Sequence, residues 1–314
     1  MILLLPLSIP SPTSATLAIG PLRLTAYGLM IALGILAAAA IAGRRLEKSG
    51  AGTRDDMSSI ALWGVLGGVV GSRLYHVATD WASFSGDLGR IPMIWKGGLG
   101  IPGGLLGGVV AGILAARRRN VQVPFVLTAA APAIPVAQAI GRWANYFNQE
   151  LFGSPTSLPW ALRIADDKIP TGYALGATFH PTFLYESLWS AGLCLGLLWI
   201  DKHVQLRPGR LFALYLGGYF AGRFWIEGLR IDRAHEIAGL RLNQWVALIV
   251  VLVVTSLFVY RKRARRDLRR RQRFDSPEPN DLSPTTVLAS GRIVERDDTI
   301  STFARRSEST ESCE

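Results

Sequence analysis

The sequence predicts an all-α polytopic membrane protein with seven transmembrane helices. Of its 314 residues, 49% are hydrophobic and only 18% are charged. A helix needs about 20 apolar residues to cross the hydrocarbon core of a bilayer, and runs of about that length alternate with polar and basic segments. The expected helices are at 22–43, 57–78, 98–116, 123–146, 182–200, 209–228 and 243–260.

Composition separates this prediction from other classes of protein. The formal net charge of +11 by itself fits a nucleic-acid-binding protein as well as one bound to anionic lipid. Long uncharged runs require a bilayer, so we expect membrane insertion and no nucleic-acid partner. The four histidines and two cysteines are scattered without metal-ligand spacing, so we expect no metal site.

The chain divides into four regions. Residues 1–21 contain four prolines and lack a basic start, which favours a short interfacial segment over a cleaved signal peptide. The seven helices form one membrane domain at 22–260. Residues 261–273 are basic and are expected to lie against anionic lipid headgroups, with a topology signal favoured over a regulatory role. Residues 274–314 are polar and rich in Pro, Ser and Thr, which predicts a disordered cytoplasmic tail.

The individual helices carry further signals. Several are rich in Gly and Ala, which favours close helix packing in lipid. The third, 98–116, begins in "GGLGIPGGLLGG", where Pro102 predicts an irregular or re-entrant start. The fifth, 182–200, follows Pro181, a residue that costs little at a helix start. The fourth ends in polar residues, and the sixth carries a charged stripe.

Basic residues in the connecting segments predict the orientation. They follow the first, third, fifth and seventh helices, so all four clusters fall on one side, which we take to be the cytoplasm. The N-terminus and the loops at 79–97, 147–181 and 229–242 are then outside. The clusters contain Arg44, Arg45, Lys48, Arg54, Arg117, Arg118, Arg119, Lys202, Arg207 and Arg210, and the run "RKRARRDLRRRQR".

The stretch "GRWANYFNQELFG", 141–153, places many polar groups at the outer end of the fourth helix. In a helix Arg142, Asn145, Tyr146 and Gln149 share one face, flanked by Asn148 and Glu150. Snorkelling to the interface explains one or two such residues. It does not explain so dense a group, and ionisable groups at membrane depth indicate function.

A second group lies in "YFAGRFWIEGLR", 219–230. Its members Tyr219, Arg223, Glu227 and Arg230 form one narrow stripe of a helix. An internal ion-pair network is the structural alternative. We expect both roles, with Glu227 orienting the arginines and their excess charge facing an anion, since a guanidinium fork suits phosphate.

Two further motifs are weaker. In "HPTFLYES", 180–187, His180 precedes the fifth helix and Glu186 lies inside it, where pairing with an arginine of another helix is as good an explanation as catalysis. Tyr27 in "TAYGLM" also fits an ordinary aromatic at the membrane interface. Together the motifs predict an arginine-rich pocket near the outer leaflet that binds an anionic lipid headgroup.

Other classes of membrane protein fit less well. A transporter or flippase usually contains an internal repeat, and none is evident between the halves of the chain. A metal-dependent phosphatidyl transferase needs clustered aspartates in a span, and none of the expected spans contains such a cluster. A structural scaffold leaves the arginine stripe unexplained.

The same motifs resemble those of the prolipoprotein diacylglyceryl transferase family. "GRWANYFNQELFG" is similar to the family pattern G-R-x-x-N-x-x-N-x-E-x-x-G, and "HPTFLYES", "RFWIEGLR" and "AYGLM" resemble three further family motifs in the same order. The resemblance covers about residues 20–260. The matching positions of the first pattern are Gly141, Arg142, Asn145, Asn148, Glu150 and Gly153.

The resemblance implies a multi-pass enzyme of the bacterial cytoplasmic (inner) membrane that needs no cofactor. Its reaction moves the diacylglyceryl group of phosphatidylglycerol to the lipobox cysteine in a prolipoprotein signal peptide, forming a thioether and releasing glycerol phosphate. By this resemblance, Arg142 and Arg223 are expected to contact the phosphate and Asn145 to bind headgroup oxygens. Glu150 is expected to bind either Arg142 or the glycerol hydroxyls.

The remaining site residues take supporting roles in this reading. Asn148 and Gly153 belong to the signature, Arg230 and Glu227 support the arginines, and Tyr27 and Tyr219 line the pocket.

The residue that activates the thiol is left open. His180, Glu186 and a basic pocket that lowers the thiol pKa are the alternatives. Many family members have a histidine in the third-helix motif, but Pro102 stands at that position here. A base at that position is therefore not available to this chain.

Overall fold

The computed structural model describes residues 8–19, 22–232 and 234–274, and it is almost entirely helical. The chain forms two compact units, Met1–Phe258 and Val259–Glu314. The helices of the first unit are α1 (Ala26–Lys48), α2 (Arg54–Thr79), α3 (Ile101–Arg118), α4 (Val123–Ala130), α5 (Ala133–Gly141), α6 (Trp143–Asn148), α7 (Thr182–His203) and α8 (Arg210–Leu229). The last helix, α9 (Leu242–Phe274), begins in the first unit and ends in the second.

The helices are those of a polytopic membrane protein. Five are long and apolar enough to cross a membrane, namely α1, α2, α3, α7 and residues 242–260 of α9. The bent pair formed by Val123–Ala130 and Ala133–Asn148 makes a sixth if it is one span. The helix α8 is outside this set because Arg223 and Glu227 lower its apolar character, so among the described residues five or six of the seven expected spans are supported.

The fourth expected helix is broken rather than continuous. A bend of 46° separates Val123–Ala130 from Ala133–Asn148. Pro132 stands at the break, where its ring and missing N–H prevent a regular helix from continuing. The third expected helix, by contrast, begins regularly at Ile101, and Pro102 occupies its first turn, where a proline is tolerated. The expected irregular start lies ahead of the helix, where residues 98–100 are not helical and Gly98 has a φ of 76°, and not at Pro102.

Glycines set the packing of α2 against α3. A Cβ atom at Gly71 would lie 2.3 Å from the carbonyl oxygen of Gly103, and one at Gly103 would lie 2.3 Å from that of Gly71. The two backbones therefore touch directly, as small residues permit in membrane helices. Polar contacts fix α7 against α5, where Ser187 Oγ donates to the Ala139 carbonyl over 2.9 Å.

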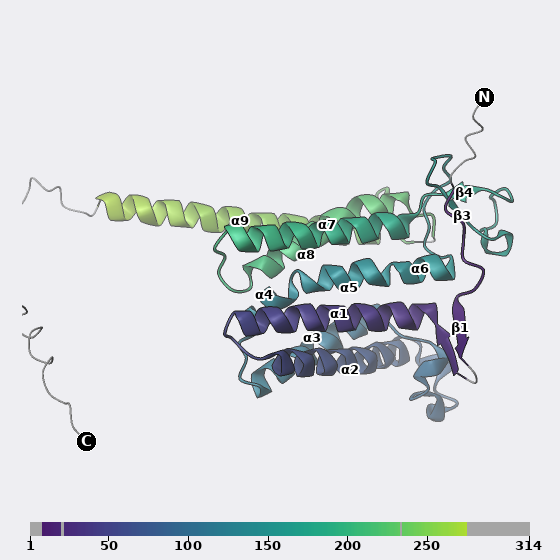
Figure 1. Cartoon of the computed structure of the whole chain (residues 1–314), viewed down its shortest axis with the longest axis horizontal. Helices are drawn as coiled ribbons and strands as arrows, with labels where there is room; N and C mark the ends of the chain where they lie inside the picture. Colours follow the sequence, from purple (N-terminus) through teal and green to yellow (C-terminus); the bar gives the residue numbers. More distant parts are fainter. Residues whose placement is uncertain (1–7, 20–21, 233, 275–314) are drawn as a thin grey trace, which may run out of the picture. The chain divides into compact units, whose positions relative to one another are not determined.

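The basic loops gather at one end of the first unit. Arg45 at the end of α1 pairs with Asp201 at the end of α7 at 2.9 Å, and Arg119 after α3 pairs with Asp55 at the start of α2 at 3.1 Å. Figure 1 shows these ends of α1 and α7 opposite the end at which α6 finishes. This confirms that the first three basic clusters share one side.

Short strands and loops cover the other end. The strands β1 (Thr16–Ile19) and β2 (Leu22–Thr25) form a hairpin, β3 (Leu162–Arg163) pairs with β4 (Thr178–Phe179), and β5 (Glu236–Ile237) pairs with β6 (Leu240–Arg241). Ile9 adds a parallel bridge to Leu162. The N-terminal residues thus pack on the loop that follows α6, around a core that contains Phe152, Leu162, Ile164, Phe179 and Phe183.

The second unit contains the end of α9. The backbone of the basic segment 261–273 is helical as far as Phe274. Its expected contact with anionic lipid stays a prediction. The expected disordered tail lies outside the described residues, except for Phe274.

Candidate active site

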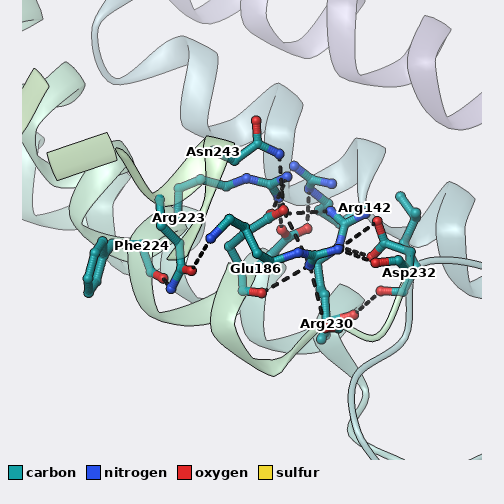
Figure 2. Close-up of polar contacts among 12 residues, drawn as sticks. Arg142, Glu186, Arg223, Phe224, Arg230, Asp232 and Asn243 are labelled. Carbon is teal, nitrogen blue, oxygen red and sulfur yellow. Dashed lines mark hydrogen bonds and ion pairs between the residues drawn. The ribbon is translucent and has the colours of Figure 1, made fainter. Parts of the chain in front are cut away.

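A carboxylate from α7 joins two arginines from other helices. Glu186 Oε2 lies 2.6 Å from Arg142 Nε, and Glu186 Oε1 accepts a hydrogen bond of 2.7 Å from Arg223 Nη1 (Figure 2). Arg142 stands at the junction of α5 and α6, and Arg223 lies on α8. Glu186 is buried, so the pairing with an arginine of another helix that the sequence left open does occur, and it occurs twice.

A second carboxylate, Glu227, is the most buried member of the cluster at 1% exposure. Its Oε2 atom lies 2.7 Å from Arg223 Nη2 and 3.8 Å from Arg230 Nη1, although neither nitrogen points at it with hydrogen-bond geometry. Its Oε1 atom accepts a hydrogen bond from Asn243 Nδ2 at 3.0 Å and lies 3.3 Å from Arg241 Nη1. Glu227 thus lies beside both arginines of the expected stripe, and its role of orienting them stays a prediction.

Asp232 closes the outer side of the cluster. It contacts Arg230 Nε at 2.7 Å and Arg241 Nη2 at 3.2 Å. Burial alone would raise the pKa of this carboxyl, but the hydrogen bond from Arg230 and the charges of Arg230 and Arg241 hold the pKa below its usual value. Four guanidinium groups therefore meet three carboxylates, which leaves one excess positive charge in the cluster.

The arginines differ in their access to a ligand. The side chains of Arg230 and Arg241 are each 8% exposed, Arg223 is 16% exposed, and Arg142 is 22% exposed. Arg223 is also held between two carboxylates, whereas Arg142 contacts Glu186 through Nε. Arg142 is therefore the guanidinium best placed to meet a bound anion with its forked end.

The polar residues of α6 form their own small network. Asn145 Nδ2 donates to Glu150 Oε1 at 3.0 Å, and Asn148 Nδ2 lies 3.5 Å from the same oxygen. Glu150 thus orients two amides, while the carboxylate bound to Arg142 is Glu186. Asn145 is buried, so its amide needs a hydrogen-bond partner inside the protein, and Glu150 provides one.

The single helical face expected for this motif is interrupted. The helix α6 ends at Asn148, and Gln149 adopts a left-handed conformation with φ of 52°. Its side chain turns to the outer loops, where Nε2 donates to the Pro12 carbonyl and Oε1 accepts from Ala165 N. Tyr146 also turns away, since its hydroxyl donates to the Pro10 carbonyl at 2.8 Å. These two residues support the N-terminal segment instead of the pocket.

His180 lies in a hydrogen-bonded chain of aromatic residues. Its Nδ1 atom is 3.1 Å from the Tyr185 hydroxyl, which accepts a hydrogen bond from Trp160 Nε1 at 3.0 Å. An indole only donates, so the Tyr185 proton is free to be given to His180. In that arrangement His180 Nδ1 is the acceptor and its Nε2 carries the proton. In the other tautomer Nδ1 donates to the Tyr185 oxygen and Nε2 is left with a free lone pair.

Gly153 joins the His180 segment to the end of α8. Its N–H donates to the His180 carbonyl at 2.9 Å, and its backbone bridges Arg230. A Cβ atom here would lie 2.8 Å from His180 Cβ and 3.0 Å from the Leu229 carbonyl oxygen. Packing of three segments therefore accounts for this glycine without a substrate contact.

The two tyrosines expected in the pocket lie apart from the ion pairs. Tyr27 is 43% exposed in the first turn of α1, a helix that packs against α6. Tyr219 stacks with Tyr215 and Phe220 at ring-centroid distances of 6.0 and 5.2 Å. Their contact with a ligand stays a prediction.

Sequence reasoning missed several members of the site. Arg241 and Asn243 bracket the start of α9 and reach Glu227, and Asp232 follows the charged stripe. A fourth missed residue, away from the cluster, is Arg73. It is buried and donates to the carbonyls of Arg90, Ile91, Gly97 and Gly98, thereby holding the loop before α3. An arginine inside an apolar run was the signal, by the same argument that singled out Arg142.

The arrangement suits an anionic ligand. Buried guanidinium groups in fixed positions stabilise negative charge more strongly than they would in water, because the surroundings screen them less. Within the described residues, no group of three His, Cys, Asp or Glu side chains is placed to hold a metal ion.

Comparison with known proteins agrees with these motifs. The family described as prolipoprotein diacylglyceryl transferase matches residues 14–260. Phosphatidylglycerol–prolipoprotein diacylglyceryl transferase 1 of Streptomyces coelicolor is 46% identical and covers 82% of this chain and 75% of its own length. Transferase 2 of that organism is 43% identical, with 90% of this chain and 92% of its own covered. The corresponding protein of Cutibacterium acnes is 46% identical, with coverage of 82% and 88%. The chain therefore belongs to the prolipoprotein diacylglyceryl transferase family.

Proposed function

We propose that this protein transfers the diacylglyceryl group of phosphatidylglycerol to the lipobox cysteine of prolipoproteins in the bacterial cytoplasmic membrane. The sulfur attacks the glyceryl carbon that carries the phosphate ester. The C–S bond forms, the C–O bond breaks with its electron pair moving to the phosphate, and glycerol phosphate leaves. The thiol proton passes to a base. Family membership and the arginine cluster both support this reaction.

The observation that carries the proposal is the position of Glu186 between Arg142 and Arg223. A preorganised guanidinium pair stabilises the charge that develops on the leaving phosphate without first having to reorganise. Arg142, as the more exposed of the two, contacts the phosphate directly, and Arg223 reinforces the positive potential behind it.

Amide groups then bind the rest of the headgroup. Asn145 and Asn148 are oriented by Glu150 and offer donors and acceptors to the glycerol hydroxyls. We assign Tyr27 and Tyr219 to contacts with the lipid away from the ion pairs, while Glu227 and Arg230 support the arginines.

His180 is the base we favour for the thiol. Both oxygens of Glu186 are already bound by guanidinium groups, so its role is to hold the arginines. As the base, His180 uses the tautomer in which Nδ1 donates to the Tyr185 oxygen, so that Nε2 offers a free lone pair to the thiol proton. The excess positive charge of the cluster is the alternative, because it favours the thiolate form of a nearby cysteine directly.

The proposed topology has seven spans, with α8 included, the N-terminus outside and the C-terminus in the cytoplasm. The membrane domain is 22–260, preceded by the interfacial segment 1–21. The basic segment 261–273 then faces the anionic lipids of the cytoplasmic leaflet. The gathering of the basic loops opposite the arginine cluster supports this orientation.

The test is a transfer assay read by mass spectrometry. The purified chain in phosphatidylglycerol-containing bilayers is mixed with a synthetic lipobox peptide, and the diacylglyceryl mass increment on the cysteine is measured. Arg142→Ala should abolish the increment, whereas Arg117→Ala, which removes an exposed arginine at the other end of the bundle, should leave it unchanged. A folded wild-type protein that gives no increment would overturn the proposed function.

A further inference from the structure

The end of the bundle opposite the arginine cluster contains a second basic pocket. It lies between the C-terminal turns of α1 and α7, the helix α4 and the loop before α8, with a volume of about 530 Å³. That volume is in the range of about 300–1,000 Å³ typical of small-ligand sites. Its charged lining residues are Arg45, Lys48, Asp201 and Lys202.

The charges of this pocket are unbalanced. Asp201 pairs with Arg45 at 2.9 Å, and it is the only carboxylate among the lining residues. Lys48 and Lys202 form none of the ion pairs found in the described part of the chain. Two positive charges are therefore left at one concave surface, where low-dielectric walls strengthen their field.

The guanidinium of Arg45 is also incompletely satisfied. One terminal nitrogen, Nη2, reaches Asp201 and lies 3.5 Å from the Thr128 carbonyl oxygen, but Nε is buried without a hydrogen-bond partner. A buried donor without an acceptor costs about 1–3 kcal/mol. Because Nε is closed to solvent, an anion in the pocket would meet Arg45 through its charge and not through this atom.

Apolar side chains form the remaining walls. Phe125, Leu198, Leu206 and Pro208 line the pocket beside the cations. A site of this kind matches a phosphate carried on an apolar stem. Basic pockets between membrane helices bind the headgroups of anionic phospholipids by this combination of charge and apolar surface.

Ordinary roles for the lysines explain less. Lysines in the last turns of α1 and α7 offset the helix dipoles and act as topology signals. Neither role requires a concave surface or an apolar wall.

We propose that this pocket binds the phosphate group of an anionic ligand, at a site separate from the transfer chemistry. Two sources share this chemistry, namely the headgroup of an anionic phospholipid and a free phosphate in solution. A phospholipid would also place an acyl chain against Phe125 and Leu198, and a free phosphate would not.

The test uses the full chain in detergent and two charge-matched double variants. Lys48→Gln with Lys202→Gln removes the unpaired cations, and Arg44→Gln with Arg117→Gln removes two exposed cations that do not line the pocket. Native mass spectrometry counts the molecules of phosphatidylglycerol retained, with phosphatidylcholine of the same acyl chains as the reference lipid. Thermal melts with inorganic phosphate or glycerol 3-phosphate probe the free anion.

The pocket variant should retain one phosphatidylglycerol fewer than wild type and bind it about thirtyfold more weakly at this site, while the control variant behaves as wild type. The same loss should occur in an Arg142→Ala background, because the second site does not depend on the first. A phosphate-dependent melting shift that only the pocket variant loses would identify a free anion as the ligand. Equal behaviour of both double variants with every probe would overturn the site.

Discussion

Glu186 holds Arg142 and Arg223 at once, with nitrogen–oxygen distances of 2.6 and 2.7 Å. The three residues come from three separate helical segments, so one carboxylate sets both the position of the arginines and the packing of the helices that carry them. This relationship gives the cluster a structural role and a chemical role together.

Glu186→Gln should therefore affect stability as well as activity. The neutral amide keeps the size of the side chain but leaves two guanidinium groups without their shared partner. Breaking such a pair costs about 3 kcal/mol, the low end for buried pairs, because Arg142 and Arg223 are partly exposed. Thermal melts in detergent measure the loss. A melting temperature equal to that of wild type would mean that the ion pairs contribute nothing to folding.

Arg142→Lys should reduce transfer by on the order of 10²-fold with the protein still folded. An ammonium keeps the charge but loses the planar fork that contacts two phosphate oxygens. The mass-spectrometric transfer rate measures this, and Arg117→Lys on the exposed end of α3 is the matched control. Near-normal turnover of Arg142→Lys would remove the phosphate role of Arg142.

His180→Ala should lower kcat by about 10²-fold if its imidazole takes the thiol proton. Tyr185→Phe should have a smaller effect, because it removes only the hydroxyl that lies 3.1 Å from His180 Nδ1. Transfer rates per folded molecule measure the loss. If melting temperature falls while activity per folded molecule is intact, His180 is a structural residue.

Because of Asp232, the thermal stability of the protein should depend on pH in the acidic range. Arg230 and Arg241 lower the folded-state pKa of Asp232 against the opposing effect of burial. The ionised carboxylate therefore stabilises the fold fully above the unfolded-state pKa of about 3.9, and this stabilisation is lost as the pH falls through the folded-state pKa. Wild type should melt above Asp232→Asn at neutral pH, and the difference should shrink in strong acid. Asp55→Asn, on the exposed surface, is the charge-matched control. A difference that is constant with pH would contradict the ion-pair origin.

Gly153→Ala should destabilise the protein by about 1–3 kcal/mol, because the new methyl group overlaps His180 Cβ and the Leu229 carbonyl. Gly192→Ala is the control, since a Cβ atom there meets nothing within 4 Å. Chemical or thermal denaturation of both variants gives the comparison. Equal stability would show that the loop at Gly153 moves aside without cost.

The amino-acid sequence by itself determined the membrane class, most helix positions and the composition of the charged stripe. Arg223 and Glu227 share a face because residues four apart do so on a helix, and Arg230 follows directly after the last residue of α8. The sequence motifs also identified the family, which the comparisons confirm. These properties depend on local periodicity and residue type, which need no knowledge of the neighbouring helices.

Only the tertiary structure decided which partners meet across helices. Nothing local to Glu186 indicates that it faces Arg142 and Arg223, or that Arg241 at the start of α9 reaches Glu227. The turn of Gln149 out of the expected helical face depends on contacts with Pro12 and Ala165, which are remote in sequence. Such contacts follow from the order and rotation of packed helices, and a single helix does not encode either.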